Sequence, residues 1–184
     1  VMTFNSGRFP RLCKFWTLVF SMAVLCSFAV GGPARAQTRA TEVRGTAEVI
    51  DADILKFGNQ RVILWGIDAP ERPQTCQLND MPWGCYDVAF RSLQLLAGRG
   101  EVVCYFQGDP DPFGRHFGIC ESGGEDLNAE MVKAGVALAF DEETDAYVGQ
   151  MTEAIMAGVG LWQPGVWFEE PWAFRRRENP SGLR

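Results

Sequence analysis

The alternation of hydrophobic and polar positions predicts three strands early in the chain. Residues 42–50 alternate apolar with polar side chains and are rich in β-branched types, which is typical of a half-buried strand. Residues 54–57 and the strongly apolar run 60–67 predict the next two strands, and Gly58-Asn59 between them is a tight-turn signal. Strands joined by such short connections form an antiparallel meander.

A loop follows, because Pro70 and Pro73 cannot lie inside a central strand. The pattern then changes to a helical period over 85–97, where apolar side chains recur on one face. Two further helices are expected over 126–134 and 144–157.

Residues 101–106 and 116–120 predict a second strand pair around a Gly/Pro-rich turn at 108–112. This order of elements fits an α+β, mainly β fold, namely a five-stranded OB-type β-barrel with three packed helices. Residues 161–174 are rich in Trp and Pro and are expected to wrap the surface, and residues 175–184 to form a flexible basic tail.

The first 36 residues have the features of a secretory signal peptide. A basic start precedes an apolar run over about 15–30 and the cleavage site Ala34-Arg35-Ala36. The alternative is a membrane anchor, but the run is shorter than the ~20 residues that a spanning helix needs. We therefore expect a periplasmic or secreted monomer without a stable membrane anchor, in which 37–174 is the folded domain.

Cleavage would make the protein strongly acidic. The leader carries four basic residues and no acidic one, so its removal takes the formal net charge from −6 to −10. Such a charge does not attract a polyanion over long range. If the protein acts on nucleic acid, individual arginine side chains must supply the positive charge.

Four cysteines follow the leader, and an even number in an exported chain favours disulfides, with three connectivities open. Cys104 and Cys120 are about equally far from the turn of the second hairpin, so they can face each other. This favours the pairs Cys104–Cys120 and Cys76–Cys85. A zinc site is the alternative, but no CxxC spacing occurs and the chain has one histidine.

Two short segments concentrate carboxylates where strands end, D-A-D at 51–53 and D-A-P-E at 68–71. Clustered oxygen atoms bind hard cations such as Ca²⁺, so Asp53 and Asp68 could share one ion if the two strand ends adjoin. The alternative is a set of solvated turn acids, which strand ends often carry.

Several motifs resemble, in the right order, those of the staphylococcal-nuclease-like (thermonuclease) family. The segments are V-I-D-A-D at 49–53, L-W-G-I-D-A-P-E at 64–71, D-P-F-G-R at 111–115, D-L-N at 126–128 and G-L-W at 160–162. No single segment is specific, but their number and order are. The resemblance implies hydrolysis of DNA and RNA phosphodiesters with one Ca²⁺.

Carried over by position, the resemblance assigns a role to each acid of these segments. Asp53 and Asp68 would hold the metal ion, and the backbone carbonyl of Ala69 would add a third oxygen. Asp51 would be a nearby carboxylate that does not bind the ion directly. Glu71 would be the general base that activates the attacking water.

The resemblance also implies two phosphate-binding arginines, of which one is missing. Arg115 matches the arginine that stabilises the negative charge building on the scissile phosphate. The other position, five residues before Asp68, is Ile63, and losing such a donor typically costs about 3–4 kcal/mol, or roughly 10²–10³ in rate. Arg61 or Arg72 could substitute; the alternative is that both are ordinary surface residues.

Phe140 replaces an expected substrate-stacking tyrosine, and the acidic run 141–143 that follows it would repel a polyanion. Two functions are therefore open. One is an exported Ca²⁺-dependent nuclease with an altered active site. The other is a catalytically impaired OB-fold module of the cell envelope that binds nucleic acid or protein.

Overall fold

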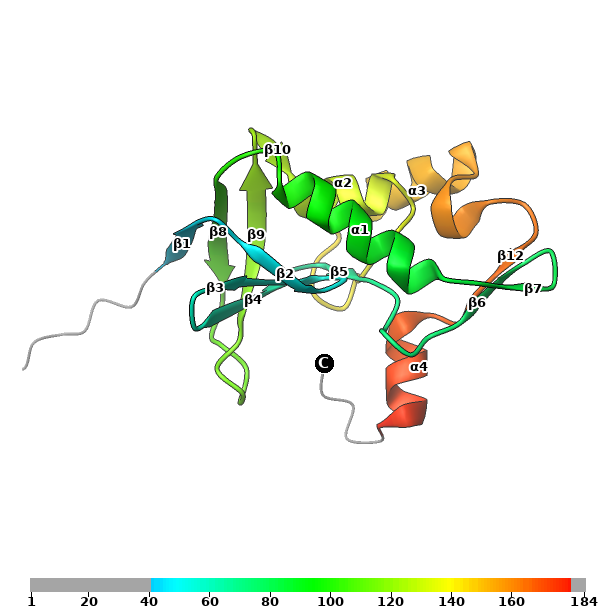
Figure 1. Ribbon diagram of the computed structural model, residues 1–184, viewed down its shortest axis with the longest axis horizontal. Helices are drawn as coiled ribbons and strands as arrows, with labels where there is room; N and C mark the ends of the chain where they lie inside the picture. Colours follow the sequence, from blue (N-terminus) through cyan, green and yellow to red (C-terminus); the bar gives the residue numbers. More distant parts are fainter. Residues whose placement is uncertain (1–40, 180–184) are drawn as a thin grey trace, which may run out of the picture. The chain divides into compact units, whose positions relative to one another are not determined.

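A mainly antiparallel sheet forms the centre of the fold. In the computed structural model, which describes residues 41–179, six of its seven strands lie in the order β1-β8-β9-β4-β3-β2, and the seventh, β10 (Glu125–Asp126), pairs with β9 (Figure 1). Their ranges, in that order, are Glu42–Gly45, Val102–Gln107, His116–Ser122, Gln60–Leu64, Ile54–Phe57 and Glu48–Asp51. Neighbours are antiparallel except β4 and β9, which are parallel. The predicted signal peptide and residues 180–184 lie outside the described part.

The predicted strand 42–50 is divided into β1 and β2, which lie at opposite ends of the order of the described strands. β1 pairs with β8 and β2 pairs with β3. Gly45, the last residue of β1, has a φ of 144°, which residues other than glycine rarely adopt. After it the chain passes from its pairing with β8 to its pairing with β3. No ladder between the described strands joins β1 to β2. The α+β class is observed, but the closed five-stranded barrel that we expected is not.

The apolar run 60–67, expected to be one strand, turns at Gly66. This residue has a φ of 75°, and a Cβ there would collide with side chains near the start of α3, so the turn requires glycine. After the turn β5 (Ile67–Asp68) pairs with β11 (Leu138–Ala139) in a separate two-stranded sheet. The turn therefore carries Asp68 out of the main sheet.

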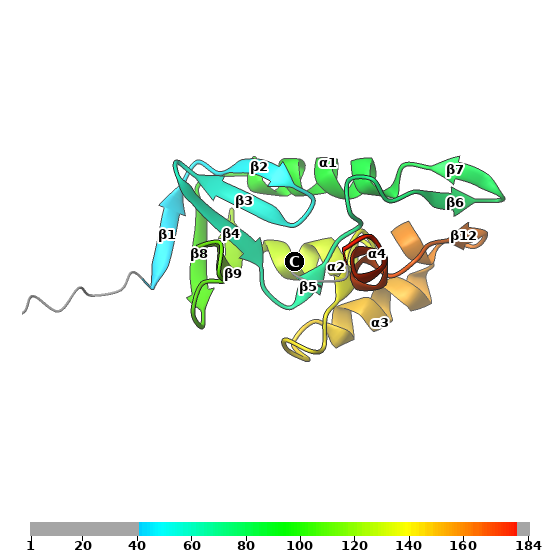
Figure 2. The ribbon, with the colours of Figure 1, turned by 90° about the horizontal axis from the view of Figure 1, so that it is seen from below.

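The three expected helices are present as α1 (Cys85–Ala97), α2 (Leu127–Lys133) and α3 (Val148–Ala157). α2 packs between α1 and α3 (Figure 2). A short 3₁₀ helix, η1 (Gly160–Trp162), follows α3. None of the helices within residues 41–179 has the length and apolar character that a membrane span requires.

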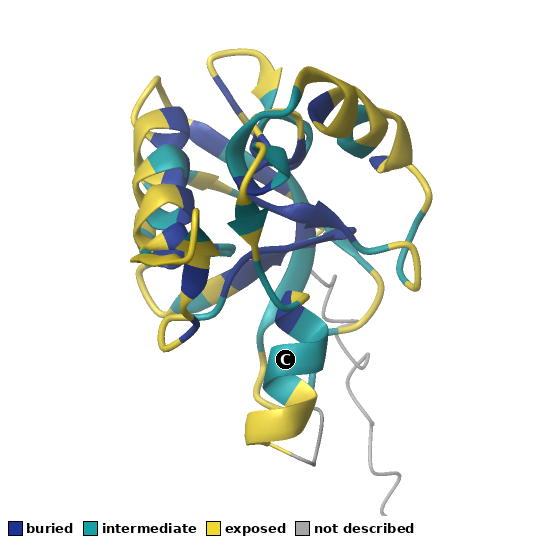
Figure 3. Cartoon of the chain, turned by 90° about the vertical axis from the view of Figure 1, so that its right-hand side faces the viewer, coloured by how far each residue is buried: buried dark blue, intermediate teal, exposed yellow. Residues whose placement is uncertain are grey.

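A fourth helix, α4 (Pro171–Glu178), was not predicted and corrects the boundary of the basic tail. Residues 175–178 belong to this helix rather than to a flexible segment. Pro171 at its start suits the first helical turn, where the missing N–H has no partner to lose. The first turn of α4 is partly buried and its last turn is exposed (Figure 3).

The stretch expected to be a loop after Pro73 contains a hairpin. β6 (Cys76–Leu78) pairs with β7 (Met81–Trp83), and β12 (Val166–Trp167) adds a third strand. A disulfide between Cys76 and Cys85 ties this small sheet to the start of α1. The second disulfide joins Cys104 to Cys120 across β8 and β9, so both favoured pairings are bonded.

The core lies between the main sheet and helices α1 and α2. Its fully buried side chains include Leu55, Val62, Leu64, Ile67, Leu93, Val102, Leu127, Met131 and Val132. A second apolar cluster surrounds the Cys76–Cys85 disulfide. The aromatic residues packed against it are Trp83, Trp162, Phe168 and Trp172. The Trp-rich segment therefore buries aromatic surface before the chain enters α4.

Candidate functional site

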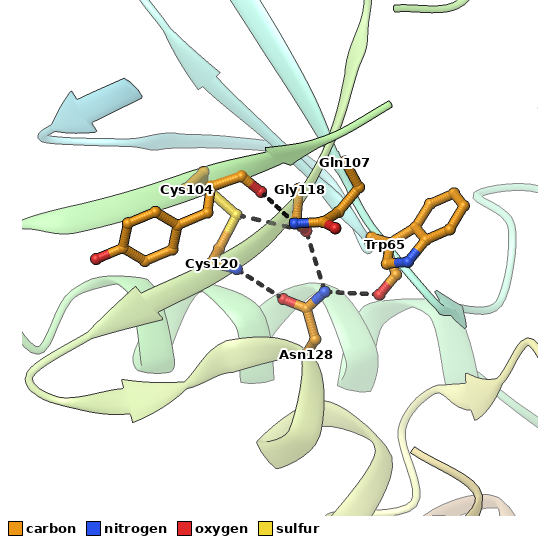
Figure 4. The surroundings of a disulfide bond; sticks show 7 residues. Trp65, Cys104, Gln107, Gly118, Cys120 and Asn128 are labelled. Atoms are coloured by element: carbon orange, nitrogen blue, oxygen red, sulfur yellow. Dashed lines mark hydrogen bonds between the residues drawn. A yellow bond between two sulfur atoms is a disulfide. The ribbon is translucent and has the colours of Figure 1, made fainter. Parts of the chain in front are cut away.

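Asp68, at the end of β5, has no exposed surface, and a buried amide fixes the turn before it. Asn128 of α2 donates hydrogen bonds to the carbonyl oxygens of Trp65 (2.8 Å) and Gly118 (3.1 Å) (Figure 4). Its own oxygen accepts a hydrogen bond from the backbone N–H of Cys120 (3.1 Å). Because an unpaired buried amide would cost free energy, these bonds hold the turn against the sheet.

The loop between β11 and α3 holds the same turn from the other side. The backbone N–H of Gly66 donates to the carboxylate of Glu143 (2.7 Å), and its carbonyl accepts from the N–H of Phe140 (2.9 Å). Asp126 caps α2 by accepting from the N–H of Ala129 (3.0 Å). The D-L-N segment thus caps one helix and positions the turn that leads to Asp68.

The guanidinium of Arg175, from α4, lies on the carboxylates of Asp68 and Glu71. Nη2 donates to Asp68 Oδ2 (2.8 Å), while Nη1 donates to Asp68 Oδ1 (3.2 Å) and to Glu71 Oε1. The Arg175 side chain is 12% exposed. The planar fork of arginine matches both oxygens of a carboxylate, which compensates the buried charge of Asp68.

Gln74 connects the Glu71 loop to the chain just before α4. Its side-chain oxygen accepts from the backbone N–H of Glu71 (3.0 Å), and its amide nitrogen donates to the carbonyl of Glu169 (2.5 Å). Gln74 is 4% exposed. The loop that carries Glu71 and the segment that leads to Arg175 are therefore held together by one buried side chain.

The surroundings of Glu71 raise the pKa of its carboxyl group. Burial raises the pKa of its carboxyl, the negative charge of Asp53 raises it further, and Arg175 opposes both without reversing the shift. Burial lowers the pKa of Arg175, but its bonds to Asp68 and Glu71 outweigh burial and leave it raised. Arg175 is therefore charged, and Glu71 takes up a proton more readily than an exposed glutamate does.

Three of the expected acidic residues, Asp53, Asp68 and Glu71, lie near one another. The carbonyl of Asp53 accepts from the backbone N–H of Leu64 (2.9 Å), so the two strand ends adjoin. Ala69, directly after Asp68, is buried. Asp51 instead faces α1, where burial and the Asp51 carboxylate together raise the pKa of Tyr86 to about 12.

The donor chemistry of the cluster suits a hard cation such as Ca²⁺. The carboxylates of Asp68 and Glu71 already hold a positive group, the guanidinium of Arg175. Within residues 41–179, however, no three His, Cys, Asp or Glu side chains are grouped closely enough to hold a metal ion. The residue types fit calcium, whereas the side chains as they stand are arranged around a guanidinium.

Arg115, the expected phosphate-binding residue, is held within its own turn. Its Nε donates to Asp111 Oδ2 (2.6 Å), and its backbone N–H donates to Asp111 Oδ1 (2.9 Å). Its guanidinium also lies over the ring of Phe113, 5.4 Å from the centroid. Burial raises the pKa of Asp111, but the hydrogen bonds from Arg115 and Phe113 outweigh it and the pKa is lowered.

Ile63 occupies the position of the missing arginine, and Arg61 and Arg72 are its two possible substitutes. Ile63 is fully buried and pairs across the sheet with Ile54 and Phe117, so β4 presents an apolar side chain there. Arg61 is exposed on the same strand. Arg72 donates to the carbonyl of Ile50 (3.1 Å) and lies over the ring of Tyr86.

Sequence reasoning missed Arg175, although a signal was present. Pro171 is a typical first helical residue, and the next residues are compatible with a helix. A helix starting there would place Trp172 and Arg175 three residues apart on one face. What the pattern could not indicate is that this face lies on Asp68, 107 residues earlier in the chain.

A small cavity of about 180 Å³ adjoins Arg175. The ring of Trp172 packs against Phe140 there, with ring centroids 5.4 Å apart. The lining residues are Phe117, Phe140, Glu142, Glu143, Trp172, Arg175 and Arg176. The aromatic position expected to stack on substrate is thus next to an aromatic side chain of α4.

The protein thus has an α+β fold in which Arg175 bonds Asp68 and Glu71. Residues 61–164, more than half of the chain, match the family model of staphylococcal nuclease homologues, and the chain belongs to this family. Members of the family generally bind nucleic acid and generally depend on Ca²⁺.

The chain is also similar to the succinoglycan biosynthesis protein ExoI of Rhizobium meliloti (strain 1021). The two are 31% identical over 130 residues, which cover 67% of this chain and 66% of that protein. The chain therefore spans just under two thirds of the length of this relative.

Proposed function

We propose that this protein is an exported nuclease that hydrolyses phosphodiester bonds in DNA or RNA and depends on Ca²⁺. The observation that carries the proposal is the cluster of Asp68, Glu71 and Arg175, in which a buried carboxylate and a second acid share one guanidinium. Membership of the nuclease family supports the reaction class.

Glu71 is suited to the role of general base. Its raised pKa brings its proton affinity closer to neutral pH, where a base that takes a proton from water is most effective. The backbone hydrogen bond from Glu71 to Gln74 limits how its loop can move. The Glu71 carboxylate would orient a water molecule and accept its proton as the water attacks phosphorus.

Asp68 and Asp53, with the carbonyl of Ala69, are the oxygen donors that would hold the calcium ion. When bound, the ion would counter the negative charge on the phosphate oxygens and orient the phosphate. Arg115 is the other positive group of the proposal. To reach a phosphate it would have to exchange one of its contacts with Asp111, which is its partner in the resting structure.

The test is cleavage of single-stranded DNA by protein that has been exported by its expression host, so that the disulfides form. We expect cleavage in Ca²⁺ and none in EDTA. Glu71→Gln should lower kcat by about 10²–10⁴-fold, the range for loss of a general base, with little change in KM. Mass spectrometry of the purified protein would show whether the leader is removed after Ala36.

A second function is kept because one observation favours it. Arg175 already bonds both oxygens of Asp68, and Glu142 and Glu143 of the acidic run line the neighbouring cavity. A catalytically impaired module of the cell envelope would have both features. Folded, disulfide-bonded protein that shows no cleavage in Ca²⁺ would reject the nuclease proposal in favour of this one.

A further inference from the structure

We propose that Arg175 is the phosphate-binding guanidinium of this site, and that helix α4 delivers it where strand β4 has none. The inference rests on the proposed function for its substrate class, a phosphodiester. It concerns a residue outside 61–164, the segment that matches the family model.

At the other positions considered for a phosphate-binding guanidinium, the side chain is either apolar or bonded to a different partner. Ile63 on β4 is apolar and has no exposed surface. Arg72 is bonded to the carbonyl of Ile50 and lies over Tyr86, and Arg115 is bonded to Asp111. Arg175 is the guanidinium that the structure brings onto Asp68 and Glu71.

The hydrogen bonds of Arg175 leave one edge of its guanidinium for another acceptor. The group has five N–H donors, and its bonds to Asp68 and Glu71 use both hydrogens of Nη1 and one of Nη2. The N–H of Nε and the remaining N–H of Nη2 lie on the same edge of the planar group. Two parallel N–H donors match two oxygens of a phosphate.

α4 brings an aromatic ring to the same cavity as this guanidinium. Trp172 is three residues before Arg175, so both side chains are on one face of the helix. Trp172 and Phe140 together line the cavity of about 180 Å³ that Arg175 also lines. A phosphate at Arg175 would therefore have aromatic surface beside it, on which a base or sugar can pack.

Glu71 links this guanidinium to the reaction centre. One acid in contact with the arginine is the proposed base, and the other is the proposed metal ligand. A phosphate on the open edge of Arg175 would lie beside Asp68, which also bonds Nη2. The acids hold the guanidinium in place before substrate arrives, which reduces the reorganisation needed during the reaction.

The test compares Arg175→Gln and Arg175→Lys with Arg177→Gln, a matched control on the exposed side of the same helix. With a labelled oligodeoxythymidine in Ca²⁺, Arg175→Gln should lower kcat by about 10²–10³-fold, the usual loss for one transition-state donor. Arg175→Lys keeps the charge but not the fork, so it should retain an intermediate kcat. Arg177→Gln should cleave like the parent.

Oligonucleotide binding in EDTA provides a readout that does not need cleavage. Measured by fluorescence anisotropy at several salt concentrations, Arg175→Gln should bind at least tenfold more weakly, with a salt slope smaller by about 0.7. Circular dichroism and thermal melting would check that each variant is folded. If Arg175→Gln does not fold, Arg175→Lys decides by the same binding and kcat measurements.

The outcomes separate the two proposals. A parent protein that binds but does not cleave would end the nuclease proposal, while weaker binding by the folded Arg175 variant would still support a phosphate contact. Unchanged or tighter binding, or unchanged or faster cleavage, by folded Arg175→Gln or Arg175→Lys would overturn the inference. Arg175 would then serve only as the ion-pair partner of Asp68 and Glu71.

Discussion

Two arginine–carboxylate sites in this protein are built in opposite ways. Arg115 and Asp111 are four residues apart and bond within one turn, through the side chain and the backbone of the arginine. Arg175 bonds Asp68, 107 residues earlier, and Glu71, 104 residues earlier. The first pair needs only the local shape of the chain, whereas the second needs α4 docked on the rest of the fold.

The two sites also differ in how strongly the carboxylate depends on its arginine. Asp68 has no exposed surface and depends on Arg175 to compensate its charge. Asp111 retains a slightly exposed side chain and backbone hydrogen bonds that remain if the Arg115 side chain is removed. A distant partner can thus be more important for stability than a neighbouring one, because burial decides the cost of an unpaired charge.

Removing the Arg175 guanidinium should have the largest effect on stability. Arg175→Gln removes the bidentate ion pair between Arg175 and the buried Asp68 carboxylate, so the free energy of unfolding should fall by about 3–5 kcal/mol in EDTA. Urea denaturation measures this. The double variant with Asp68→Asn should recover much of the loss, and a loss that persists in the double variant would mean that α4 docking matters more than the charge.

Arg115→Gln should be destabilising by less, about 1.5–3 kcal/mol, the range for a hydrogen bond to a charged group. The pKa of Asp111 is lowered in the folded protein, so the pair stabilises above the unfolded pKa of that carboxyl. This contribution is lost as the pH falls through the folded pKa. Urea denaturation at neutral and acid pH should therefore show the difference between parent and variant shrinking in acid.

Calcium should bind more tightly to Arg175→Gln than to the parent protein. The guanidinium holds both oxygens of Asp68, which a cation would also use, so the two positive groups oppose each other. A gain of about tenfold lies within the usual range for coupled sites. Isothermal titration calorimetry with Ca²⁺ would detect it, with Arg115→Gln as the control; equal affinities would mean that Arg175 and the ion do not compete.

The same variant should raise the pKa of Glu71 further, because it removes a cause that lowers this pKa. NMR titration of labelled glutamate carboxyl carbons can follow the change. Since the folded pKa of Glu71 is already raised, its protonation stabilises the folded state, and this stabilisation is lost as the pH rises through the folded pKa. In Arg175→Gln that loss should extend to higher pH, whereas Arg115→Gln should leave it in place.

The smallest effect is expected at the exposed pair of α4. Arg177 bonds Glu169 (3.0 Å) at the surface, where solvent screens the interaction. Arg177→Gln should leave the melting temperature unchanged within error. A clear decrease would show that α4 is held by this surface pair as well as by Arg175, and would weaken the contrast between the two sites.

Several elements and contacts of the fold could be predicted from the sequence. Periodicity indicated α1 and the strand pair β8–β9, and equal spacing from the turn favoured the Cys104–Cys120 disulfide. The acids of 51–53 and 68–71 were expected to meet if the two strand ends adjoin, and the backbone of Asp53 does bond that of Leu64. All of these features depend on residues close in sequence or on one hairpin.

The splitting of 42–50 at Gly45 and of 60–67 at Gly66 was not predicted. Both runs have the composition of continuous strands, and the breaks depend on which partner strand each half meets. The expected closed barrel is not observed among the described strands, and alternation along a strand does not specify which strands pair at the edges of a sheet. A side chain at Gly66 would collide with Thr144 and Tyr147, just before α3, so the need for glycine depends on a contact from elsewhere in the chain.

The sequence by itself indicated the family, the two acidic segments and the absence of an arginine at position 63, and it favoured the two disulfide pairs that the structure contains. These are properties of residue types and their spacing. Only the tertiary structure decided that Arg115 is paired with Asp111 and that Arg175 lies on Asp68 and Glu71. The physical reason is that a charge buried away from water takes the partner that the packed fold brings to it, and for Asp68 that partner comes from the last helix.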